Sequence, residues 1–373
     1  MDERADEATR EALIELVNNN INRKFFKEKR LEAFFEKCFT LQEPDKLMAE
    51  QEFYSFVYYD LKQVLQLVTG TGNLVNFTKF MVFFKVDEDP ELIEILTEQI
   101  CSKIKYFTVD ELLTICANYS HTLSPQTKEI FRVVNEEFCI RLTHEHNPSS
   151  FELVFKPEDL MKITATMLEY EQMHDTLKNG VIDYIKDEMG NVTFETMSEL
   201  AVIFAMKMDP TYKGMFFSHV VGKCMKELRH LKDETLYKIV WSLVKSQTVV
   251  VAAESVRWQT IKQNIKSRAK DLNPKVMADL LVLSTMEAVA SEAENQKDLF
   301  SMVEGELMSK MKVMALEDLV NLMWTGLKIN RGSHLYYDRL ERELAKRMRG
   351  IKDEQFETLL QCFIGDKGEH SLT

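Results

Sequence analysis

The sequence predicts an all-α protein, an α-solenoid of about seven helix-turn-helix repeats of roughly 40 residues behind an N-terminal helical cap. Three observations lead to this prediction. Apolar residues recur three and four positions apart, prolines stand where such runs begin, and the runs themselves recur along the chain. We find no convincing alternation of apolar and polar residues, the pattern typical of a β-strand.

Prolines mark the starts of the predicted helices. Proline is tolerated in the first turn of a helix but breaks its interior. Five prolines each stand just before a periodic apolar run: Pro90, Pro125, Pro157, Pro210 and Pro274. Between them the apolar residues follow one helical face, as the set Leu236, Ile239, Val240 and Leu243 illustrates.

A pair of apolar residues spaced by three, usually after an acidic residue, recurs along the chain. The pairs begin near residues 77, 112, 160, 197, 236, 277, 319 and 356. The one long step, from 112 to 160, is explained by an insertion that contains the polar loop 144–150. A second apolar ladder follows most of these pairs, starting at Phe131, Leu177, Phe217, Trp258, Phe300 and Tyr337. A hairpin of this length cannot bury its apolar face alone, so we expect neighbouring hairpins to stack.

The repeat places a domain boundary near the loop 69–73, which reads TGTGN. Residues 1–73 carry apolar stripes outside the repeat, and we predict that they form the N-terminal helical cap. Residues 74–373 form the predicted helical repeat array.

Two repeat units share an aromatic residue at one offset. The segments KIVWSLVKS (238–246) and NLMWTGLKIN (321–330), with their acidic lead-ins DETL and LEDL, resemble the helical repeats of FAST-kinase-like, RAP-domain and octotricopeptide proteins. The resemblance covers the units from about Phe77 onward and includes no RAP domain. It implies paired helices of this length, residence in an organelle and RNA binding on a concave basic surface.

Charge and composition limit the function classes. Lys and Arg number 47 and Asp and Glu 60, so the net charge is −13, and the molecule as a whole repels a phosphate backbone. RNA is therefore a disfavoured partner. The six cysteines are scattered with no CxxC pair, which favours a reducing compartment. We expect no cleavable targeting segment and no membrane span.

Catalytic motifs are missing from the sequence. It contains no GxxxxGK loop, no GxGxxG, no GxSxG elbow and no HExxH helix, so we expect neither an enzyme nor a cofactor. His144 and His146, with Glu137 upstream, are the best candidates for a metal site. Two loop histidines without a third obvious ligand are more typical of a solvated connection, and we expect no metal.

The helix predicted over 257–271 carries the most basic surface in the chain. Its basic residues are Arg257, Lys262, Lys266, Arg268 and Lys270. Such a stripe could contact RNA phosphate, an anionic lipid headgroup or an acidic partner, although charge runs on helices are usually solvated faces.

These observations favour a non-catalytic scaffold or accessory structural subunit of a large multiprotein assembly, acting through protein-protein contacts. The resemblance indicates a mitochondrial assembly. One alternative is an organellar RNA-binding repeat protein involved in RNA processing or translation. Another is a ciliary or cytoplasmic scaffold.

Overall fold

The computed structural model describes residues 3–19, 28–86, 89–121, 124–143, 156–187, 190–246, 256–290 and 299–347, together with positions 350, 352, 354, 356 and 357. The described residues are helical and contain no strand, which confirms the all-α prediction. The chain divides into two compact units, Met1–Tyr184 and Ile185–Thr373. Each unit is described by itself below.

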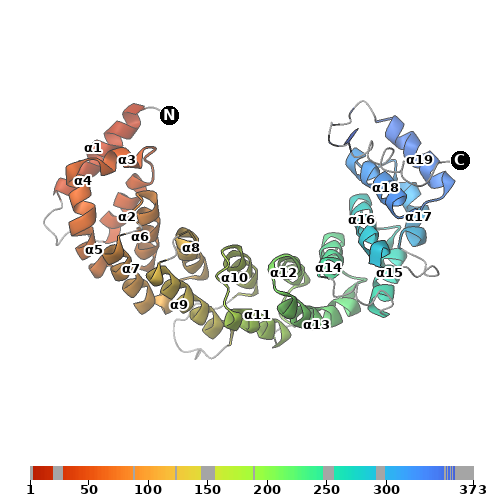
Figure 1. Cartoon of the computed structure of the whole chain (residues 1–373), viewed down its shortest axis with the longest axis horizontal. Coiled ribbons are helices and arrows are strands. Elements are labelled where there is room, and N and C mark those ends of the chain that lie inside the picture. The colour runs from red at the N-terminus through yellow and green to blue at the C-terminus, as the bar shows by residue number, and fades with distance from the viewer. Residues whose placement is uncertain are drawn as a thin grey trace. The chain divides into compact units, whose positions relative to one another are not determined.

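Unit 1 begins with α1 to α5 and the π-helix η1, and continues into longer helices (Figure 1). The bounds are α1 Glu3–Asn19, α2 Glu28–Cys38, α3 Pro44–Met48, α4 Gln51–Ser55, η1 Phe56–Asp60, α5 Leu61–Leu67, α6 Thr71–Phe83, α7 Pro90–Ser102, the 3₁₀-helix η2 Ile104–Tyr106, α8 Val109–Tyr119, α9 Pro125–Leu142, α10 Pro157–Glu169 and α11 Asp175–Asp187. The last helix, α11, runs across the division between the units.

Unit 2 consists of helices of similar length throughout its described part. The bounds are α12 Phe194–Lys207, α13 Pro210–Glu227, α14 Asp233–Lys245, α15 Val256–Arg268, α16 Pro274–Ala290, α17 Leu299–Lys310, α18 Leu316–Lys328 and α19 His334–Ala345.

Within each unit helices pack against the helix two positions along the chain, and α6, α8, α12, α16 and α18 also pack against the helix that follows them. In unit 2 the helices α12, α14, α16 and α18 contact one another in series, and α13, α15, α17 and α19 form a second series. In unit 1 the series are α6, α8 and α10, and α5, α7 and α9. We call the series with even numbers the first layer and the other the second layer. Helices of one layer thus cover part of one another's apolar faces within each unit.

The proline prediction is confirmed. Each of the five prolines is the first residue of a helix, α7, α9, α10, α13 or α16. Side-chain caps also support helix starts: at α7 the Asp89 carboxylate accepts from the N–H groups of Glu91 and Leu92, and Thr108 and Glu111 form a capping box at α8.

Three turns between a first-layer helix and its partner have the same geometry. The second residue after the helix has positive φ at Lys85 (56°), Glu171 (56°) and Asn330 (50°). The next N–H then reaches back five residues, from Val86 to Met81 (2.8 Å), from Gln172 to Met167 (2.8 Å) and from Arg331 to Gly326 (2.9 Å). This is the Schellman motif, which satisfies the last carbonyl groups of a helix.

The predicted cap region shares a core with the first hairpin of unit 1. The Phe35 ring of α2 lies 4.9 Å from Phe77 and 5.6 Å from Phe80 of α6, measured between centroids. All three rings are fully buried. The compact units divide after Tyr184, and a cap boundary at residue 73 stays a prediction.

Seven of the predicted repeat starts, from residue 77 to 319, lie inside first-layer helices, α6 to α18. The eighth, at Phe356, falls among the isolated positions described after residue 347. Among the described residues, no helix combines the length and the apolar character that crossing a membrane requires.

Candidate interaction surface

The structure separates the five basic residues of the predicted stripe. Lys262 of α15 is buried, with 1% of its surface exposed, because it lies on the same helical face as Trp258 and Ile265. Lys262 therefore does not belong to an exposed stripe. Lys266 and Lys270 are exposed, while the side chain of Arg257 lies outside the described side chains.

Arg268 is directed into the fold instead of toward a partner. Its guanidinium donates to the Leu228 carbonyl oxygen (2.9 Å) and pairs with the Asp233 carboxylate (2.6 Å). For Lys266 and Lys270, contact with an anionic partner stays a prediction.

The Arg268 contact belongs to a recurring set. A basic residue at or near the end of a second-layer helix donates to backbone carbonyls that follow the preceding second-layer helix, and we call these residues the staples. The pairs are Lys103 with Val68, Arg141 with Ile104, Lys105 and Phe107, Lys223 with Val192, Arg268 with Leu228, Lys310 with Lys270 and Leu272, and Arg347 with Met311, Lys312 and Met314.

The staples contact the C-terminal ends of helices, where a positive charge is stabilising. The C-terminal end of a helix carries unpaired carbonyls and the negative end of the helix dipole, and both favour a positive side chain. Burial lowers the pKa of Lys103, yet its ammonium still reaches the Val68 carbonyl at 2.8 Å. The staples therefore join successive hairpins inside a unit and leave fewer cations on the surface.

Arg141 is the most buried staple that carries a charge partner. Its Nε donates to the Glu137 carboxylate at 2.7 Å, and the two side chains are 5% and 7% exposed. Glu137 thus serves an ion pair, whereas His144 and His146 of the metal hypothesis lie outside the described residues. The described residues hold no group of three His, Cys, Asp or Glu side chains placed to bind a metal ion.

The first layer of unit 2 presents one side-chain stripe per helix that its core does not use. Each stripe follows positions i, i+4, i+7 and i+11, one face of a helix. The outer stripe consists of Glu195, Glu199, Val202 and Met206 on α12, Glu234, Lys238, Trp241 and Lys245 on α14, Lys275, Asp279 and Val282 on α16, and Glu317, Asn321, Trp324 and Lys328 on α18.

The first two positions of the outer stripe hold five acidic residues, two lysines and one asparagine. Lys238 bridges Glu199 of α12 (2.6 Å) and Glu234 of its own helix (2.7 Å). This pairing shows that the stripes of α12 and α14 lie in register. Farther along, burial raises the pKa of Asp279, and the nearby carboxylates of Asp318 and Glu317 raise it further.

The third position of the outer stripe is apolar on every helix. It holds Val202, Trp241, Val282 and Trp324, each partly exposed. The Lys328 ammonium lies 4.3 Å from the Trp324 ring centroid, a cation-π contact. The outer stripe therefore combines carboxylates and ammonium groups with an adjacent apolar row that crosses four packed helices.

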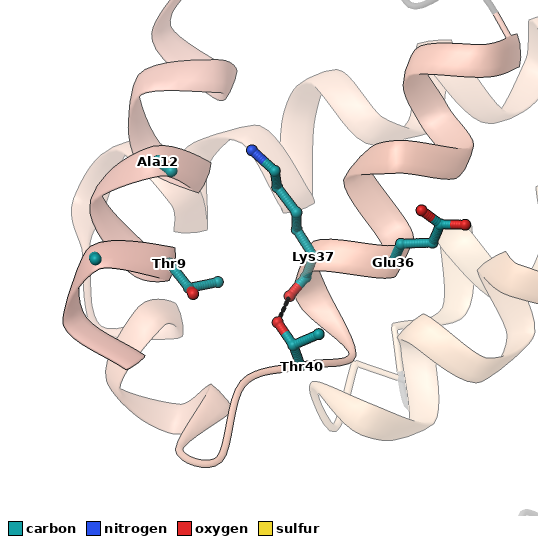
Figure 2. Close-up of a pocket in the computed structure, with 6 residues that line it drawn as sticks. Thr9, Ala12, Glu36, Lys37 and Thr40 are labelled. Carbon is teal, nitrogen blue, oxygen red and sulfur yellow. Dashed lines mark hydrogen bonds between the residues drawn. The ribbon is translucent and has the colours of Figure 1, made fainter. Parts of the chain in front are cut away.

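Unit 1 contains a shallow pocket (Figure 2). It lies between α1 and α2, has a volume of about 330 Å³ and is lined by Ala8, Thr9, Ala12, Glu36, Lys37 and Thr40. The Thr40 hydroxyl donates to the Lys37 carbonyl oxygen (2.7 Å), so this hydroxyl is already engaged.

Sequence reasoning missed both the staples and the outer stripe. The stripe could have been found by aligning the acidic lead-ins DETL and LEDL, which place Trp241 and Trp324 seven residues after Glu234 and Glu317. Comparison of the sequence with models of known protein families, and with curated proteins, found no match.

Proposed function

We propose that the chain is a non-catalytic scaffold, an accessory structural subunit that holds other proteins of a large assembly. In this proposal residues 74–373 form an α-solenoid of about seven repeats of roughly 40 residues. The observation that carries it is the reiterated packing within each unit, where hairpins stack in two layers and the staples join them. An array of this kind presents an extended surface, which suits contact with several partners.

The second support is the use of charge. The staples direct Arg and Lys side chains into the fold, and the protein carries a net charge of −13. An RNA-binding array needs a basic face, so the charge distribution favours protein partners over RNA. Residence in the mitochondrion rests on the family resemblance, and microscopy of a tagged copy tests it against the cytoplasm and the cilium.

The test of the scaffold proposal is the native state of the endogenous protein. We expect the tagged chain, purified gently and sized by mass photometry, to run with other proteins far above its own 43.6 kDa. Treatment with ribonuclease should leave the assembly intact. A free monomer under all gentle conditions contradicts the proposal, and collapse on ribonuclease treatment favours the RNA alternative.

A further inference from the structure

Three turns of unit 2 place a basic residue at the same position. The fourth residue before α14, α16 and α18 is Arg229, Lys270 and Lys312, respectively, and all three side chains are exposed. We call these three residues the basic row. In each turn the next N–H bonds back across three residues, from His230 to Glu227 (2.8 Å), from Asp271 to Arg268 (2.9 Å) and from Val313 to Lys310 (3.0 Å). The cations therefore occupy equivalent positions of the backbone.

The staples hold these turns side by side. Arg268, the last residue of α15, donates to the Leu228 carbonyl oxygen (2.9 Å) in the first turn. Lys310, the last residue of α17, donates to the Lys270 carbonyl oxygen (2.8 Å) in the second turn. Because each donor ends the next second-layer helix, the three turns follow one another along one edge of unit 2.

The fold does not engage the basic row as it engages the staples. In the part of the chain that the structure describes, Arg229 and Lys270 form no ion pair. Lys312 acts on the Glu343 carboxylate, which already pairs with Lys346 at 2.7 Å and with Arg347 at 3.7 Å. The basic row therefore keeps its positive charges accessible to a partner.

The charges around the basic row favour an anionic ligand. The last helical turn and the turn that follows it span residues 225–231, 266–272 and 308–314. Their exposed charged side chains are five cations, Lys226, Arg229, Lys266, Lys270 and Lys312, and two carboxylates, Glu227 and Asp271. The nearby Asp233 carboxylate already pairs with Arg268 at 2.6 Å. A protein whose net charge is −13 thus has a local excess of positive charge along this edge.

The spacing of the row fits an extended polypeptide. Packed helices lie about 8–10 Å apart, so successive turns of the edge recur at about that step. An extended chain rises about 3.3 Å per residue and advances about 10 Å in three residues. A carboxylate at every third residue therefore meets successive cations.

We propose that the basic row binds an extended acidic segment of a partner protein that carries Asp or Glu at every third residue. The carboxylates pair with Arg229, Lys270 and Lys312. Lys226 and Lys266 lie one helical turn earlier and add to the positive potential. This inference rests on the scaffold function proposed above and names the partner segment for one edge of unit 2.

RNA is the competing polyanion, and two observations disfavour it. Proteins that bind single-stranded nucleic acid stack the bases on aromatic side chains, whereas residues 225–231, 266–272 and 308–314 include no Phe, Tyr or Trp. A long phosphate backbone also extends beyond the three turns, along a molecule that is acidic as a whole. A short acidic peptide segment meets the basic row alone.

The test uses the full-length protein and a fluorescent synthetic peptide of repeated Glu-Ser-Ser triplets, followed by anisotropy at low salt. We expect it to bind more tightly than a peptide of the same composition whose glutamates form one block. Arg229→Gln, Lys270→Gln and Lys312→Gln each weaken binding by roughly two- to fivefold, with a shallower salt dependence. The triple variant weakens it by roughly tenfold or more.

Matched controls change the charge of the same unit outside the basic row. Lys207→Gln on α12 and Lys245→Gln on α14 each remove an exposed ammonium group of the first layer, and both should leave peptide affinity unchanged. Asp271→Asn removes a carboxylate next to Lys270 and should strengthen binding by roughly twofold. Far-UV circular dichroism checks that every variant is folded.

Three outcomes overturn the inference: equal binding of the block peptide, equal loss in the control variants, or binding of single-stranded RNA in place of the peptide. They are distinguishable from failure of the scaffold function, which native sizing reports. A protein that runs in an assembly but ignores the triplet peptide keeps its scaffold function and loses this edge as a binding surface.

Discussion

Arg141 provides the sharpest test of how the staples hold unit 1 together. Its guanidinium pairs with Glu137 at 2.7 Å and donates to the Phe107 carbonyl at 2.9 Å, with the side chain 5% exposed. Arg141→Met keeps the length of the side chain and removes the charge. The change leaves the Glu137 carboxylate buried without a cation.

The expected loss is large. Breaking a buried ion pair by removing one partner costs about 3–5 kcal/mol, because the remaining charge stays desolvated. The double variant Arg141→Met with Glu137→Gln removes that charge as well. Its loss should fall to about 1–3 kcal/mol, the cost of carbonyls left without a charged donor.

The assay is urea unfolding followed by two signals. All three tryptophans, Trp241, Trp258 and Trp324, lie in unit 2, so tryptophan fluorescence reports that unit while far-UV circular dichroism reports both. Arg141→Met should lower the midpoint of the dichroism transition more than that of the fluorescence transition.

The matched control is Arg132→Met on the same helix. Arg132 is 48% exposed and pairs with Glu129 at 2.6 Å and with Glu136, so its loss should change the midpoint little. Equal midpoints for Arg141→Met, Arg132→Met and the unchanged protein would refute the reasoning about the staples.

Three further predictions concern single positions. Gly326→Ala places a Cβ 2.8 Å from the Tyr337 hydroxyl and 3.2 Å from the Arg331 carbonyl, so it should destabilise unit 2 by about 1–3 kcal/mol. Gly305→Ala adds a Cβ in open space on α17 and should stabilise unit 2 by up to about 1 kcal/mol. Chemical unfolding compares the two variants, and a gain in stability for Gly326→Ala would be inconsistent with the close α18–α19 crossing. Glu171→Gly relieves a left-handed residue at φ 56° and should stabilise unit 1 by up to about 1 kcal/mol, measured in the same way, with a clear loss as the contradicting result. The pKa of Asp279 is raised in the folded protein, so its contribution to stability is present below its unfolded pKa of about 3.9 and is lost as pH rises. Asp279→Asn should therefore raise Tm at pH 7 and make less difference toward pH 4. A lower Tm at pH 7 would contradict the raised pKa.

The helical elements could be predicted from the sequence because their signals are local. Pro90, Pro125 and Pro274 mark helix starts through a steric rule that acts on one residue. The apolar pairs beginning at Leu236 and Leu319 lie on faces that neighbouring first-layer helices cover. Periodicity and proline position therefore carried the all-α prediction.

The burial or exposure of each charged side chain could not be predicted in the same way. Lys262 and Lys266 share one side of a helix by spacing, yet one is buried and the other exposed. The face of α15 that packs against α13 and α17 is set by Trp258, Ile261 and Ile265, and Lys262 lies among them. The apolar residues of α15 mark the buried face of the helix, and Lys262 belongs to that face.

The Schellman turns could not be predicted from the sequence for a different reason. Glycine is the usual residue at the left-handed position, and a sequence search looks for it there. Lys85 and Glu171 occupy that position here, where the surrounding helices impose the geometry. Only the packing of each hairpin, and not its turn residue, identifies these turns.

Net charge alone is a weak guide to the partner, because it does not say where the cations are used. The guanidinium groups of Arg141, Arg268 and Arg347 donate hydrogen bonds to backbone carbonyls inside their units. A cation held at a helix end cannot also bind phosphate, so such staples make the accessible face more acidic than the composition implies. The net charge of −13 therefore underestimates how strongly the accessible surface disfavours a nucleic acid backbone.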